Sequence, residues 1–141
     1  MPGPPSELGR RLARVALAEV DLIRPLDAGV DDDVLRPVEI EVLERAYQAA
    51  RITPDTLSYL EAHGTGTLLG DPIEIEALLN VLGQGRDKTS PLVIGSVKTN
   101  IGHLESAAGV AGVAKAILML RHRQIPSHLH LKKINPLLAI E

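Results

Sequence analysis

Apolar residues along the chain follow two spacings, one typical of helices and one typical of short buried strands. Residues 37–50 carry apolar side chains at helical spacing and predict an amphipathic helix. Apolar runs at 57–62 and 92–97 predict two strands, and residues 72–83 and 104–121 predict two further helices. The order helix, strand, helix, strand, helix is typical of an α/β layer.

The first 36 residues fit this alternation less well. Residues 6–21 predict a surface helix that Ser6 caps, with docking to a partner as the alternative. Residues 25–34 predict a solvated linker. Its run Asp31-Asp32-Asp33 could suggest a divalent metal, but the spacing and flanks do not match a calcium loop.

The predicted helix at 104–121 has little side-chain bulk in its first half. Six of its positions are small: Ala107, Ala108, Gly109, Ala111, Gly112 and Ala114. A glycine inside a helix costs about 1 kcal/mol relative to alanine, so we expect close approach of another element to offset that cost. We therefore predict a buried central helix whose N-terminus points at the site, with Lys115 and Arg121 complementing the helix dipole near its end.

Composition narrows the function classes. The net charge of −3 and an aromatic content of 1% argue against a nucleic-acid surface. The chain has no cysteine, which excludes disulfides and thiolate metal sites within it. We predict a cytoplasmic protein, because no apolar run is long enough for a membrane span and the start of the chain lacks the apolar core of a signal peptide.

A polar, glycine-rich stretch follows the first predicted strand. It reads Glu61-Ala62-His63-Gly64-Thr65-Gly66-Thr67-Leu68-Leu69-Gly70-Asp71-Pro72-Ile73-Glu74. We expect Asp71 to cap the next helix, Pro72 to take its first position and Glu74 to close a capping box. His63 then stands at the carboxyl end of a strand, where ligands usually meet α/β proteins.

A second polar stretch follows the second strand. It reads Lys98-Thr99-Asn100-Ile101-Gly102-His103-Leu104-Glu105. If the two strands are neighbours, His63, Lys98 and His103 converge on one pocket.

These two stretches resemble the histidine motifs of β-ketoacyl synthases from modular and iterative polyketide synthases. EAHGTGTLLGDPIE and VKTNIGHLESAAGVAG match that family almost letter for letter, and the resemblance runs from about residue 37 to 136. It implies a partial thiolase-like fold with α/β/α/β/α layers, of which this chain holds part of the second half. The predicted domains are an unmatched N-terminal helix and linker at 1–36 and a partial synthase domain at 37–141.

The resemblance also implies a chemistry, the decarboxylative condensation of acyl and malonyl thioesters. His63 and His103 would be the active-site histidines, each presenting an N–H to the thioester oxygen, and Lys98 would accompany them. Thr65 and Thr67 would bind the phosphopantetheine arm of an acyl carrier protein, unless they merely satisfy loop backbone groups. By resemblance Asp71 and Glu74 would also hold this loop in place, and the other implied structural residues are Asn100 and Gly102. No bound cofactor or metal is implied.

Some assignments stay open within the resemblance. Related elongation synthases carry a glutamate nine residues after the second histidine, where this chain has Gly112, so the partner of Lys98 is open. His128 and His130 alternate on a segment predicted to be extended from 125 to 131, but nothing else supports a metal there.

The resemblance further implies a nucleophilic cysteine on an earlier stretch that these residues do not contain. We therefore expect a fragment that is inactive alone, completed by the missing part of a synthase or by a homodimer mate. The alternative is a non-catalytic interaction fragment that binds a complete synthase or acyl carrier protein. A nucleotide-binding loop at Gly64, Gly66 and Gly70 is disfavoured, because the carboxylate of Asp71 would repel phosphate.

Overall fold

The structure is a computed structural model that describes residues 15–17, 32–87, 89–138 and 140. Its strands are β1 (Val15–Leu17), β2 (Tyr59–Glu61) and β3 (Val93–Gly95). Its α-helices are α2 (Asp32–Ala50), α3 (Gly70–Leu78), α4 (Lys98–Ile101) and α5 (Ala108–His122). Two 3₁₀ turns, η2 (Pro54–Thr56) and η4 (Glu105–Ala107), and a π-helical turn, η3 (Leu79–Gly83), complete the described elements.

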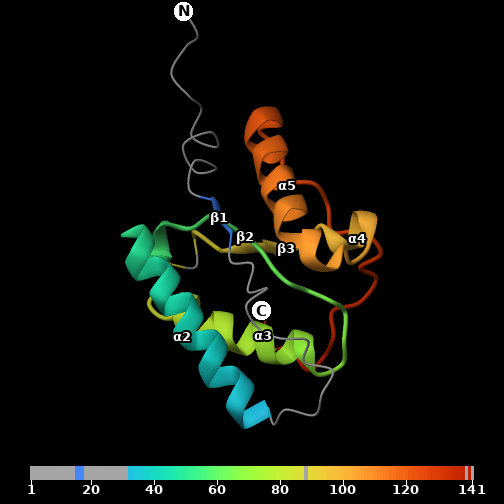
Figure 1. The fold of residues 1–141 in the computed structure, drawn as a ribbon. Coiled ribbons are helices and arrows are strands. Elements are labelled where there is room, and N and C mark those ends of the chain that lie inside the picture. The colour runs from blue at the N-terminus through green and yellow to red at the C-terminus, as the bar shows by residue number, and fades with distance from the viewer. Residues whose placement is uncertain (1–14, 18–31, 88, 139, 141) are drawn as a thin grey trace, which may run out of the picture.

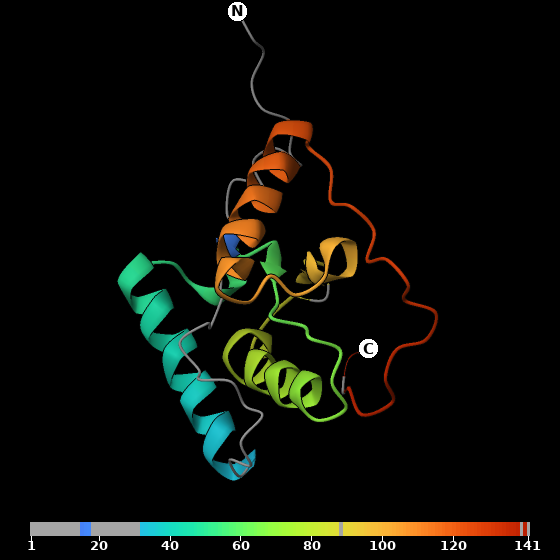
Figure 2. The same cartoon turned by 45° about the vertical axis from the view of Figure 1, so that its right-hand side comes forward.

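The three strands form one parallel sheet in the order β1-β2-β3. Leu60 at the middle of β2 is aligned with Ala16 of β1 and Ile94 of β3. Helices α2 and α3 lie on one side of this sheet, and α4 and α5 lie on the other (Figures 1 and 2). The predicted α/β alternation with neighbouring parallel strands is confirmed, so the two polar stretches leave the same edge of the sheet.

The side covered by α2 and α3 holds the main apolar core. Leu60 of β2 is fully buried there. Its neighbours in the cluster come from α2, from the loop before β2, and from α3 and η3: Leu43, Tyr47, Leu57, Ile75, Ala77, Leu78 and Leu82. These residues come from segments that the apolar pattern predicts as helices and a strand, and they close this side within the chain itself.

The side covered by α4 and α5 is far more open. Helix α5 buries only one stripe, made of Ala108, Gly112, Ala116 and Met119. Val110, Ile117 and Leu118 are 73%, 58% and 53% exposed. The prediction of a buried central helix is therefore wrong for the described chain, because only one stripe of α5 is buried and its other faces are exposed to solvent.

The predicted helix at residues 6–21 is also wrong where the structure describes it. Val15–Leu17 form strand β1, because pairing with β2 overrides the local helical pattern. The rest of that prediction, and Asp31 of the acidic run, lie outside the described residues. Helix α2 begins at Asp32, so the end of the predicted linker is helical. The boundary at residue 36 stays a prediction.

After α5 the described chain contains turns and bends but no further helix or strand. His130, predicted in an extended segment, instead lies in a turn with φ of 63°. The predicted turn at Asn135 is confirmed, since the Leu138 N–H donates to the Asn135 carbonyl over 3.0 Å. None of the helices in the described parts of the chain combines the length and hydrophobicity that a membrane crossing requires.

Candidate active site

The loop after β2 is held by carboxylates from the start of α3. The N–H groups of His63 and Gly64 donate to the two oxygens of Glu74 over 2.7 and 2.9 Å. The N–H of Gly66 donates to Asp71 Oδ1 over 3.0 Å. Two acidic side chains thus fix the backbone that carries His63, without using the imidazole itself.

The predicted capping roles at this helix are wrong. Helix α3 begins at Gly70, so Pro72 is its third residue, and Leu69 at the N-cap makes no side-chain hydrogen bond. Thr67 Oγ1 accepts the Gly70 N–H over 3.0 Å. The acidic side chains bind the preceding loop because its N–H groups have no partner in a sheet, and a threonine two positions before the N-cap serves the helix end.

Glu74 lies in a mixed electrostatic environment. Burial raises the pKa of the Glu74 carboxyl above its usual 4.5, and the nearby charge of Asp71 adds to the rise. Hydrogen bonds from the Gly64 and His63 backbone oppose it, as does the positive charge of Lys98. The positive charge of Lys98 therefore acts on the Glu74 carboxyl group. Position 112, where related elongation synthases carry a glutamate, is a glycine in this chain.

The second polar stretch forms α4 and the turn that follows it. Gly102 ends α4 with φ of 77°, a left-handed conformation that favours glycine, and so turns the chain towards His63. Beyond it, the N–H of Glu105 donates to His103 Nδ1 over 3.0 Å. Since Nδ1 accepts this bond, the neutral imidazole of His103 carries its proton on Nε2.

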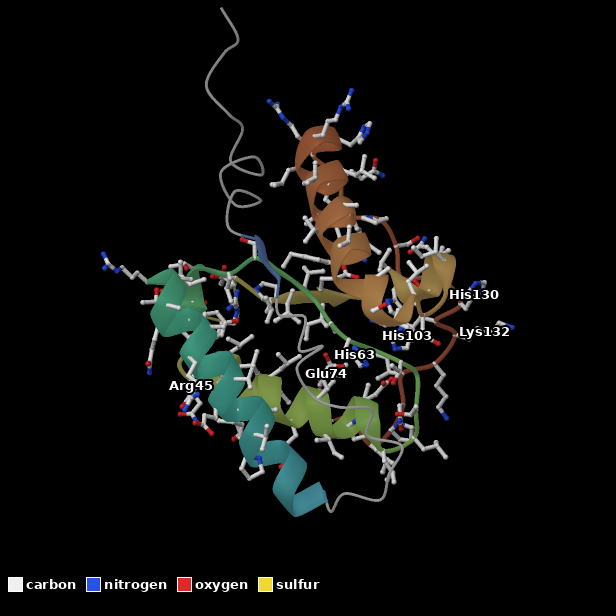
Figure 3. All side chains as sticks on the ribbon, viewed as in Figure 1. Arg45, His63, Glu74, His103, His130 and Lys132 are labelled. Carbon is white, nitrogen blue, oxygen red and sulfur yellow. The ribbon has the colours of Figure 1, made fainter. Side chains whose placement is uncertain are left out.

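The two histidines lie side by side. Their ring centroids are 5.3 Å apart and the ring planes meet at 83°, an edge-to-face arrangement. Figure 3 shows His63 between Glu74 on one side and His103 on the other. His63 is half-buried and His103 is exposed, so the pair borders solvent.

A close contact between the strand ends supports this arrangement. A methyl group added to Gly64 would come within 3.0 Å of Ser96 Cβ, and Gly64 has φ of 48°. Ser96 is buried, and its hydroxyl lies 3.5 Å from the carbonyl oxygen of His63. The glycine allows the His63 loop and the end of β3 to touch.

Thr65 and Asn100 are two further residues predicted at the site. Thr65 is exposed. Asn100 lines an apolar groove of about 490 Å³ between α4, α5 and the segment after α5, together with Ile101, Leu118 and Met119. Neither His63 nor His103 lines that groove. A single cavity shared by His63, Lys98 and His103 stays a prediction.

Sequence reasoning missed a buried polar cluster behind the site. Glu61 is 4% exposed, and its Oε2 accepts the Tyr59 hydroxyl at 2.5 Å and pairs with Lys115 Nζ at 2.8 Å. Its Oε1 accepts the N–H of Val97, the residue before Lys98. The predicted role of Lys115 near the end of the helix is wrong, because this lysine is in mid-helix and ion-paired. The signal was an acidic residue at the end of an otherwise apolar strand.

A family model described as the β-ketoacyl synthase C-terminal domain matches residues 36–132. One component of the phenolphthiocerol/phthiocerol polyketide synthase of Mycobacterium tuberculosis is 56% identical over 98 residues, which are 70% of this chain and 5% of that protein. Erythronolide synthase EryA3 of Saccharopolyspora erythraea is 53% identical over 100 residues, covering 71% of this chain and 3% of that protein.

Two solved ketosynthases of the bacillaene synthase from Bacillus amyloliquefaciens share the fold. The module 1 ketosynthase has a TM-score of 0.67 and 48% identity, covering 72% of this chain and 18% of its own. Ketosynthase twelve has a TM-score of 0.69 and 39% identity, covering 82% and 21%. The predicted partial thiolase-like α/β fold is thereby confirmed, and this chain spans only a small part of each relative.

Proposed function

Because this chain belongs to the β-ketoacyl synthase family, we propose that it supplies the histidine half of a condensation site in the ketosynthase domain of a polyketide synthase. The observation that carries the proposal is the His63–His103 pair, with ring centroids 5.3 Å apart. The two imidazoles lie on segments that follow the adjacent parallel strands β2 and β3, on the side where α/β proteins bind ligands.

The chemistry asks for hydrogen-bond donors at a developing oxyanion. A malonyl thioester loses carbon dioxide, and the electrons of the broken C–C bond form an enolate. The enolate carbon attacks the carbonyl carbon of an acyl thioester on a cysteine, and the carbonyl oxygen gains the negative charge as the new C–C bond forms. The cysteine thiolate leaves when this tetrahedral oxyanion collapses to the β-ketone. His103 Nε2–H, fixed by the bond at Nδ1, is a donor suited to the thioester oxygen, and His63 stands beside it.

The acyl-carrying cysteine must come from outside these 141 residues, since they contain none. Histidine does not replace it as the acyl carrier, so we propose that the 141 residues alone do not condense. Lys98 would add positive potential, and its charge already acts on Glu74. Asp71 and Glu74 would act through the backbone they hold rather than by touching substrate.

The substrates would arrive as thioesters on the phosphopantetheine arm of an acyl carrier protein. Thr65 and Thr67 lie exposed on the loop beside His63, and the Thr67 hydroxyl accepts the Gly70 N–H while keeping its own proton to donate. We propose that the protein acts in the cytoplasm and that its site works without a bound cofactor or metal.

A chimaera tests this proposal. Residues 36–132 would replace the matching segment of the module 1 bacillaene ketosynthase, which is 48% identical and brings the rest of its own domain. We expect the chimaera to make β-ketoacyl product from acyl and malonyl carrier thioesters, measured by mass spectrometry. His63→Ala and His103→Ala should each lower kcat by about 100-fold or more.

The matched control is His128→Ala, an exposed histidine outside the pair, which should leave kcat unchanged. A folded chimaera that makes no product, or one whose kcat is equally insensitive to all three substitutions, would contradict the proposal.

A second function rests on the open face of the molecule. Val110, Ile117 and Leu118 expose apolar side chains on α5, beside the apolar groove. Exposed apolar area of this kind marks interaction surfaces. We propose as the second candidate that this face binds the cysteine-bearing remainder of a ketosynthase, because the chain spans only 18% of such a protein.

Mixing the 141-residue chain with a separately produced cysteine-bearing ketosynthase segment tests the second candidate. A stable complex on size exclusion, lost in Ile117→Lys, would support it. A chain that elutes apart from that segment, or binds equally well with Ile117→Lys, would exclude it. The chimaera experiment judges the first proposal independently.

A further inference from the structure

A buried ionic cluster lies directly behind the two histidine segments. It consists of Tyr59 and Glu61 on β2, Lys115 on α5 and the backbone N–H of Val97. The Glu61 side chain is 4% exposed and the Lys115 side chain 11%. Two buried charges lose most of their hydration, so the contacts within this cluster have to replace it.

Each oxygen of Glu61 has its own partners. Oε2 accepts the Tyr59 hydroxyl and faces Lys115 Nζ at 2.8 Å, while Oε1 accepts the Val97 N–H. Lys115 Nζ also lies 5.4 Å from the centre of the Tyr59 ring, within cation–π range. Burial raises the pKa of the Tyr59 hydroxyl, and its bond to Glu61 raises it further, so Tyr59 remains a donor.

Gly95 makes room for this cluster. A Cβ at that position would lie 2.7 Å from the Tyr59 hydroxyl and 3.4 Å from Lys115 Nζ. Any side chain there would collide with the groups that meet at Glu61. The small residue at the end of β3 is thus explained by the cluster rather than by backbone conformation.

The connection to the site runs through the backbone. Glu61 is the last residue of β2, two positions before His63, and its Oε1 accepts the N–H of Val97, the residue before Lys98. The Val97 carbonyl in turn accepts the N–H groups of Asn100 and Ile101, so Val97 anchors α4. One carboxylate therefore ties the segment carrying His63 to the segment that carries Lys98 and leads to His103.

We propose that Glu61, ion-paired with Lys115 and hydrogen-bonded by Tyr59, is a positioning residue that sets the distance between His63 and His103. It does so by fixing the Val97 N–H, and it does not touch substrate. The expected effect of Glu61 on catalysis rests on the proposed function. Its effect on the spacing of the two histidines can be measured without any enzymatic activity.

Two double variants of the full chain separate positioning from mere stability. Glu61→Gln with Lys115→Met removes both charges and keeps an oxygen that accepts the Val97 N–H. Glu61→Met with Lys115→Met also removes both charges but leaves Val97 without that acceptor. Replacing a buried ion pair with apolar side chains of similar size is often neutral for stability, so both should fold, as checked by circular dichroism.

We expect the Glu61→Gln pair to keep the cross-relaxation between the His63 and His103 ring protons in NMR spectra. In the Glu61→Met pair, hydrogen exchange at the Val97 amide should rise by about tenfold or more, and that cross-relaxation should be lost. Tyr59→Phe is a milder variant that removes one bond to Glu61 and should raise Val97 exchange by a smaller factor. Glu44→Met, on an exposed position of α2, is the control and should change neither readout.

If the Glu61→Met pair keeps the ring contact, or if both pairs lose it together, the positioning role is wrong. Should the double variants fail to fold, unchanged Val97 exchange in Tyr59→Phe would overturn the proposal. In the chimaera, the Glu61→Met pair should lower kcat with little change in KM. A chimaera that cannot condense before any substitution would count against the proposed function alone, since the NMR readouts judge the positioning role by themselves.

Discussion

The two sides of the central sheet differ in how completely this chain covers them. On the side of α2 and α3, Leu60 is fully buried among apolar residues of the same chain. On the side of α4 and α5, large apolar residues such as Ile117 face solvent, and one stripe of α5 is buried together with the ionic cluster at Glu61. We call the side of α2 and α3 the closed side and the side of α4 and α5 the open side. The closed side holds the main apolar core, and the open side leaves apolar side chains exposed next to the site.

The two sides should differ most in the stability that is lost when a large side chain is replaced by alanine. Leu60→Ala should lower the free energy of unfolding by about 2–5 kcal/mol, because it leaves a cavity in the closed core. Ile117→Ala on the open side should change it by no more than about 0.5 kcal/mol. Urea denaturation measures both, and equal losses would mean that α5 is covered in solution.

The two tyrosines give a smaller contrast. Tyr59→Phe should cost about 1–3 kcal/mol, because it removes a buried donor to the Glu61 carboxylate. Among the described residues the buried Tyr47 hydroxyl has no hydrogen-bond partner, and burial raises its pKa to about 12. Tyr47→Phe should therefore stabilise the protein by about 1 kcal/mol. Thermal unfolding of both variants checks the pair, and a loss of stability in Tyr47→Phe would contradict it.

Glu74 predicts a pH-dependent effect. Its folded pKa is raised above 4.5, so the carboxyl contributes stability that is fully present below pH 4.5 and is lost as the pH rises through the folded value. Glu74→Gln cannot titrate, so the stability advantage of the unsubstituted protein over this variant should shrink from acidic to neutral pH. An advantage that grows with pH would show that the hydrogen bonds from His63 and Gly64 outweigh burial.

The smallest effect on stability should come from a charge on the open face. Leu118→Lys should leave the free energy of unfolding within about 0.5 kcal/mol of the original, since the residue is half-exposed. It should nevertheless reduce the binding of a hydrophobic dye, because it interrupts the apolar surface of α5. Unchanged dye fluorescence would indicate that the open face is not what the dye detects.

The same contrast explains what the sequence could predict. The α/β alternation followed from apolar periodicity, and His63 and His103 followed from their place after two strands. The capping roles of Asp71 and Glu74 were wrong because a carboxylate near a helix start also has loop N–H groups within reach. Local pattern does not decide between these partners.

Two further misses needed long-range information. The small residues of α5 indicated a close neighbour, but the pattern could not show that the described chain covers only one stripe of that helix. Glu61 and Lys115 are 54 positions apart in the sequence. They meet only because helix α5 packs over the parallel sheet that contains β2. Strand β1 likewise depends on pairing with β2 rather than on its own sequence.

The central claim is that these residues bring two imidazoles together before any other part of a synthase is added. NMR spectra of the unsubstituted 141-residue chain at neutral pH test it, with ring signals assigned from His63→Gln and His103→Gln variants. We expect direct cross-relaxation between the two rings, consistent with centroids 5.3 Å apart. Two assigned rings in a folded chain with no cross-relaxation between them would contradict it.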